Sequence, residues 1–162
     1  METIMLGVGD LAATNSPGDV IKTLALGSCV AVMMLDPVTR SVGMVHVALP
    51  HSEVNDQKAR EKPGYFADTG VPALLDEMRK RGYRGNGKGM IVKLAGGAKI
   101  MDPGNTFNIG KRNVLAIKKA LWSLGMGTVG EDVGGSISRN VAVDVNTGSI
   151  VISSTGRNDW YI

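Results

Sequence analysis

The chain has 162 residues, a formal net charge of +3, one cysteine and only 4% aromatic residues. That length is typical of one domain with a substantial hydrophobic core, and a single cysteine excludes internal disulfides. The small charge and the scarcity of aromatic residues argue against nucleic-acid binding.

Neither end of the chain nor its interior suggests a membrane protein. Residues 1–15 have no basic segment and only a short apolar run, which is not the pattern of a signal peptide. The longest uninterrupted apolar run, residues 29–35, is far shorter than the roughly 20 residues of a membrane span. We therefore expect one cytoplasmic domain over residues 1–162, without membrane insertion.

Most of the expected elements are strands. Eight segments rich in β-branched residues and flanked by turn residues are predicted strands: 4–8, 20–25, 29–35, 43–49, 89–94, 129–133, 140–145 and 149–153. The last two flank Asn-Thr-Gly at 146–148 and predict a hairpin. The 22 glycines separate these segments and are typical of turns and bulges.

Two segments have helical periodicity instead. Residues 71–81 place apolar side chains on one face, with Pro72 suited to the first turn and Gly82 at the end. Residues 111–124 do the same and end at Gly125. The predicted fold class is α/β (α+β), a layered sandwich with mainly antiparallel sheets and two main helices.

The only cysteine and both histidines lie within residues 23–52. A turn beginning at Asp36 and Pro37 would pair strands 29–35 and 43–49, which brings His46 close to Cys29. The two side chains share a face if paired residue numbers sum to 75 or 77, and lie on opposite faces if the sum is even.

Each of these residues has a simpler structural interpretation when considered alone. A lone cysteine is more often a small buried hydrophobe, and a histidine inside an apolar run is more often a hydrogen-bonded core residue. Together they predict a nucleophile and its base, because an imidazole can promote formation of the thiolate at neutral pH. The backbone N–H groups of Gly27, Ser28 and Cys29 could bind an oxyanion, and Thr23 could orient the imidazole.

Other polar features have less specific interpretations. His51 follows Pro50 and is expected in an exposed loop, and no metal site is predicted, because the ligand count and spacing do not fit. The glycine-rich segments 95–99 and 132–139 lack the phosphate-loop pattern and are predicted to form tight loops around a site. The carboxylates at predicted turns are expected to cap them: Asp36, Asp68, Asp102 and Asp132.

Thr23, the sequence Leu-Gly-Ser-Cys ending at Cys29, and His46 followed by Leu49-Pro50 together resemble the CheD family of chemoreceptor glutamine deamidases. The resemblance continues through segments 65–78, 93–100, 109–113, 132–139 and 141–152. It implies a fold similar to the catalytic domain of cytotoxic necrotizing factors. No cofactor is implied.

The resemblance also implies a reaction. Cys29 would attack a receptor glutamine and form a thioester with release of ammonia, His46 would transfer protons, and Thr23 would hold the imidazole. Hydrolysis would leave glutamate, and glutamyl methyl esters could be cleaved in the same way. The implied partners are the helical cytoplasmic region of methyl-accepting chemotaxis receptors and a CheC-type phosphatase that inhibits deamidation.

Two alternatives remain open at this stage. A cysteine amidase or transglutaminase-like enzyme with another protein substrate would use the same residues. A non-catalytic adaptor that only binds the phosphatase or the receptor would not need Cys29.

Overall fold

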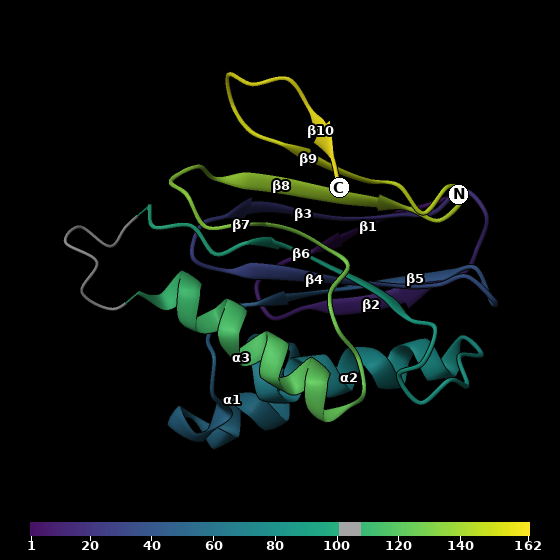
Figure 1. Cartoon of the computed structure of the whole chain (residues 1–162), viewed down its shortest axis with the longest axis horizontal. Helices are drawn as coiled ribbons and strands as arrows, with labels where there is room; N and C mark the ends of the chain where they lie inside the picture. The colour runs from purple at the N-terminus through teal and green to yellow at the C-terminus, as the bar shows by residue number, and fades with distance from the viewer. Residues whose placement is uncertain (101–107) are drawn as a thin grey trace.

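The computed structural model describes residues 1–100 and 108–162, which form three layers (Figure 1): an outer sheet, a central sheet and a layer of helices. The outer sheet has the strand order β1 (Thr3–Leu6), β3 (Val20–Leu26), β8 (Arg139–Asp144), β9 (Ile150–Ser153) and β10 (Trp160–Tyr161). The central sheet has the order β2 (Leu11–Thr14), β5 (Ser41–Val47), β4 (Val30–Asp36), β6 (Ile91–Gly96) and β7 (Gly130–Val133).

The helical layer covers the face of the central sheet that points away from the outer sheet. It contains α1 (Asp56–Glu61), α2 (Ala67–Lys80), α3 (Ile109–Ser123) and the short 3-10 turns η1 (Ser52–Val54) and η2 (Pro63–Tyr65). None of the helices in the described residues is long and apolar enough to cross a membrane.

Strand β4 is buried on both faces, which explains its continuous apolar sequence. Val30, Val32 and Met34 pack in the cluster shared with α2 and α3. The alternate residues Ala31 and Met33 pack in the cluster between the two sheets. The centre of the molecule is therefore two hydrophobic cores separated by one sheet.

The structure confirms the predicted fold class. Among the described residues, only the pairs β1–β3 and β6–β7 are parallel, and the other strand pairs are antiparallel. All eight predicted strands and both predicted helices are present, with ends shifted by a few residues. The β8–β9 hairpin turns at residues 146–148, where Gly148 has φ of +71°.

One prediction about α2 was wrong. The helix begins at Ala67, so Pro72 lies inside it rather than in its first turn. The earlier start follows from tertiary contacts, because the N–H of Ala67 donates to the carbonyl of Leu49 (2.9 Å) and Phe66 forms a bridge with the same residue. Gly82, with φ of +106°, ends the helix as predicted.

Sequence analysis missed two strands and a short helix. Strand β2 is only four residues, two of them alanine, and is held by its pairing with β5. Strand β10 has two residues. Helix α1 buries no residue, so it has no apolar periodicity to detect, and it depends on the Asn55 side chain, which accepts from the N–H of Lys58 (3.0 Å).

Candidate active site

Cys29 and His46 lie on one face at the end of the central sheet. The β4–β5 register pairs Ala31 with His46 and Val30 with Val47. The two residue numbers of each pair sum to 77, which is one of the two sums predicted to put Cys29 and His46 on the same face. Extended by one residue, this register puts Cys29 opposite Ala48, two positions from His46. Because Ala31 faces the outer sheet, its cross-strand partner His46 faces that sheet as well.

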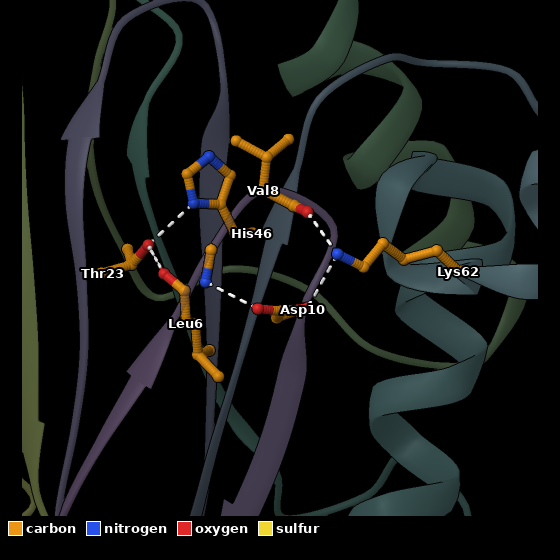
Figure 2. Close-up of polar contacts among 7 residues, drawn as sticks. Leu6, Val8, Asp10, Thr23, His46 and Lys62 are labelled. Carbon is orange, nitrogen blue, oxygen red and sulfur yellow. Dashed lines mark hydrogen bonds and ion pairs between the residues drawn. The ribbon is translucent and has the colours of Figure 1, made fainter.

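Thr23 reaches His46 from the outer sheet. Its Oγ1 lies 2.7 Å from Nδ1 of His46 and 2.8 Å from the carbonyl oxygen of Leu6 (Figure 2). Thr23 is fully buried and His46 is 3% exposed, so water does not compete for these contacts. The predicted proximity of the two side chains is therefore observed.

The contacts of Thr23 determine the tautomer of the His46 ring. A threonine hydroxyl has one hydrogen, and the Leu6 carbonyl can only accept, so Thr23 donates that hydrogen to Leu6. Thr23 Oγ1 must then accept from His46, which places the ring hydrogen on Nδ1. In the neutral ring the free lone pair is consequently on Nε2.

His46 Nε2 is buried and has no hydrogen-bond partner in the part of the chain that the structure describes. Burial lowers the pKa of His46, and the nearby Asp10 carboxylate opposes this shift. The ring is therefore neutral at pH 7, with one nitrogen available to accept a proton.

Asp10 belongs to a turn that also holds the backbone of His46. Its carbonyl accepts the His46 N–H (3.1 Å), and its carboxylate forms an ion pair with Lys62 (3.0 Å) and accepts from the Gly7 N–H (2.8 Å). Burial acts to raise the pKa of Asp10, but the bonds from Gly7 and Lys62 outweigh it and lower the pKa. Asp10 thus remains ionised near the imidazole (Figure 2).

Cys29 is a free, partly buried thiol in the loop before β4. Gly27, Ser28 and Cys29 line a cavity of about 420 Å³ together with residues of the 95–99 loop and the start of α3. Burial raises the pKa of the thiol, and its own backbone N–H opposes the shift. The free protein therefore holds a neutral thiol and a neutral imidazole rather than the thiolate that the residue pairing had suggested.

Both glycine-rich segments support the Cys29 loop, in agreement with their prediction as tight loops. The Gly97 N–H donates to the carbonyl of Cys29 and the Ala98 N–H to that of Gly27, both at 2.8 Å. Gly96 has φ of +120°, and a Cβ there would collide with the Cys29 carbonyl oxygen. The buried Arg139, from the second segment, donates to the Gly96 carbonyl (3.3 Å).

The remaining predicted polar residues lie outside this site. His51 is exposed, at the start of η1. Asp36 caps its turn through Val38 and Thr39, as predicted.

The other carboxylates at predicted turns bind neighbouring groups. Asp68 accepts from Ser52. Asp132 binds Arg139 and Trp160, and Asp102 lies outside the described residues. No three His, Cys, Asp or Glu side chains within 1–100 and 108–162 are grouped as metal ligands.

Sequence analysis did not identify Asn113 as a site residue. It lies on α3, is fully buried, and its Nδ2 donates to the carbonyls of Ser28 (2.9 Å) and Ala48 (3.0 Å). A detectable signal was its spacing, because Asn113 is four residues before Ile117 and therefore on the apolar face of a helix. A polar residue at such a position requires a buried partner.

Comparison with known proteins shows which family the chain belongs to. The family model described as CheD chemotactic sensory transduction matches residues 48–154. A protein of Syntrophotalea carbinolica named probable chemoreceptor glutamine deamidase CheD is 52% identical over 100% of both chains. The chemoreceptor glutamine deamidase CheD of Thermotoga maritima is 41% identical over 152 residues, which cover 94% of this chain and 92% of that protein.

The fold is that of an α+β protein, and its candidate hydrolase site contains the buried Thr23–His46 pair and the free thiol of Cys29. The chain belongs to the CheD family. Among solved structures, the Bacillus licheniformis hypothetical protein YfiH aligns with a TM-score of 0.45 and 14% identity. That alignment covers 78% of this chain and 50% of that chain.

Proposed function

We propose that this chain hydrolyses the side-chain amide of specific chemoreceptor glutamines to glutamate, with Cys29 as nucleophile, His46 as proton carrier and Thr23 as the residue that orients the imidazole. Membership in the CheD family and the names of the curated relatives support this amide-hydrolase activity. The residue roles are inferred from the site geometry.

The hydrogen bonding of Thr23 is the observation that carries the assignment. By donating to Leu6 and accepting from Nδ1, Thr23 leaves Nε2 of His46 as a free base. A structural histidine in a core would normally have both ring nitrogens satisfied. His46 faces the space between the two sheets, and Cys29, in the loop directly before β4, packs against the cluster in that same space, which suits proton transfer from the thiol.

The first half of the reaction forms a thioester. His46 Nε2 accepts the thiol proton as the sulfur of Cys29 bonds to the amide carbon of the glutamine. The negative charge that develops on the amide oxygen is stabilised by backbone N–H groups of Gly27, Ser28 and Cys29. The protonated imidazole then gives its proton to the departing nitrogen, the C–N bond breaks, and ammonia leaves.

The second half regenerates the enzyme. His46 accepts a proton from water, the resulting hydroxide attacks the thioester carbon, and the C–S bond breaks with return of the proton to sulfur. The product is glutamate.

The substrate is a side chain on another protein. The cavity of about 420 Å³ beside Cys29 is lined mainly by loop residues and the start of α3, which suits a side chain presented on the helical cytoplasmic region of a receptor. We propose that a CheC-type phosphatase occupies the same surface and competes with the receptor, in the cytoplasm.

Mass spectrometry of a receptor cytoplasmic fragment tests this proposal. The fragment is incubated with wild-type protein, Cys29→Ala, His46→Ala or the control His51→Ala. We expect glutamine-to-glutamate changes at discrete sites with wild type and His51→Ala, and none with the other two variants. A fragment that binds the wild type but stays unmodified would support the adaptor alternative and overturn the enzyme assignment.

A further inference from the structure

Asn113 joins the two segments that carry the proposed nucleophile and base. One hydrogen of its Nδ2 is donated to the carbonyl of Ser28, the residue before Cys29, and the other to the carbonyl of Ala48, two residues after His46. The last pair of the β4–β5 ladder is Val30 with Val47. The Asn113 amide therefore bridges the strands where their own ladder ends.

The orientation of the Asn113 amide is fixed by these contacts. Reversing it would place its oxygen against two carbonyl oxygens, so Nδ2 must be the atom that faces them. Its Oδ1 is buried and has no hydrogen-bond partner in the described residues. An amide that leaves its acceptor unsatisfied while using both donors is better suited to holding the two carbonyls than to stabilising the core.

Holding the Ser28 carbonyl also fixes the next N–H group. The described residues contain no cis peptide bond, so the Cys29 N–H points opposite to the Ser28 carbonyl. The N–H and the sulfur of Cys29 belong to the same residue, so the orientation of this peptide plane, together with the side-chain torsion, sets the direction of the N–H relative to the sulfur.

We propose that Asn113 is a positioning residue that fixes the Ser28–Cys29 peptide plane and so directs the Cys29 N–H toward the oxyanion formed when the sulfur attacks. This inference rests on the proposed function. Asn113 does not touch the substrate and acts through the backbone of the nucleophile.

Two reactions of the same sulfur separate this role from general structural support. Deamidation forms an oxyanion, whereas alkylation by iodoacetamide displaces iodide at a saturated carbon and forms none. Loss of a single oxyanion donor typically lowers kcat by about 10²–10³-fold. A misplaced Cys29 N–H should therefore slow deamidation far more than alkylation, which loses only the help that this N–H gives to thiolate formation.

The experiment compares wild type with Asn113→Leu, which has a similar shape without donors, and with Asn113→Ser, a smaller residue that keeps a hydroxyl. Deamidation of the receptor fragment and alkylation by iodoacetamide are both measured, after circular dichroism has established the temperature range in which each variant is folded. The control Ile117→Val alters a buried residue one turn away on α3.

For Asn113→Leu we expect kcat to fall about 100-fold, with KM unchanged and a much smaller decrease in the alkylation rate, and a smaller decrease of kcat for Asn113→Ser. Equal losses of deamidation and alkylation, or full deamidation in folded Asn113→Leu, would overturn the positioning role. If wild type itself leaves the fragment unmodified, the proposed function fails and the inference fails with it. Wild-type activity together with an equally active variant refutes the role of Asn113 alone.

Discussion

The Thr23 hydroxyl decides which nitrogen of the His46 ring carries hydrogen, because its own hydrogen is used by the Leu6 carbonyl. Thr23→Val removes this acceptor and leaves Nδ1–H buried without a partner, so the ring can adopt the other tautomer. General-base catalysis contributes about 10²–10⁴-fold, and we expect kcat to fall within this range for Thr23→Val. Thr23→Ser, which keeps the hydroxyl, should retain most of the activity in the same deamidation assay.

The pH dependence follows from burial of both reacting groups. Burial lowers the pKa of His46 below its ordinary value of 6.5, so the ring stays neutral, and the enzyme active, to below pH 6.5. As the pH falls further through the lowered pKa, protonation of Nε2 removes the base and kcat/KM should decrease. A pH profile of kcat/KM measures this directly.

At alkaline pH the titrating group is the thiol of Cys29. Burial raises the pKa of its thiol above the ordinary 9.0, so the rate of alkylation by iodoacetamide should still be rising with pH at 9.0 and level off only above that value. A rate that is already maximal at neutral pH would show a preformed thiolate and imidazolium pair, and would contradict neutral resting groups.

The sequence was sufficient to predict the β4–β5 register that turns Cys29 and His46 to the same side, because strand alternation and a short hairpin restrict where side chains can point. The contact of Thr23 with His46 joins two different sheets and does not follow from that hairpin. The protonation states could not be predicted in the same way. They depend on burial between the two sheets and on the Asp10 carboxylate. Asp10 directly precedes β2, a strand that was not predicted from the sequence.

At the scale of elements, Gly110 of α3 contacts the 95–99 loop, which supports the backbone of Cys29. A Cβ at Gly110 would collide with the carbonyl of Gly97, whose N–H holds the Cys29 carbonyl. We expect Gly110→Ala to lower the free energy of unfolding by about 1–3 kcal/mol and to reduce deamidation at temperatures where the variant is folded. Denaturant unfolding and the receptor-fragment assay measure the two effects.

Leu115→Ala is the matched control on the same helix, since Leu115 is 57% exposed. Its free energy of unfolding should change by no more than about 0.5 kcal/mol. If Gly110→Ala were as neutral as this control, close packing of α3 on the Gly97 backbone would be refuted.

The long elements were predictable because their apolar residues repeat with a clear period, as in α3. Elements without such a pattern were not. Helix α1 has Ala59 as its single apolar residue, and the start of α2 is set by backbone contacts with Leu49, a residue distant in sequence.

At the scale of the whole molecule, the two hydrophobic cores share the central sheet. Met33 packs in the core between the sheets and Met34 in the core beneath the helices, and both side chains are fully buried. Because β4 contributes to both cores, they should unfold together. Met33→Ala and Met34→Ala should each lower the free energy of unfolding by about 2–5 kcal/mol within one cooperative transition.

Calorimetry tests this coupling. Two separate transitions in the wild type, or a variant in which only one transition moves, would contradict the expectation that residues 1–162 form a single domain.

The measurement that tests the central claim most directly is detection of the thioester on Cys29. Wild-type protein is mixed with the receptor fragment, the reaction is stopped with acid, and the covalent adduct is mapped by mass spectrometry. We predict an adduct between Cys29 and the former glutamine, formed with loss of ammonia and released by hydroxylamine. Deamidation that proceeds without this adduct and persists in Cys29→Ala would contradict the assignment of Cys29 as the nucleophile.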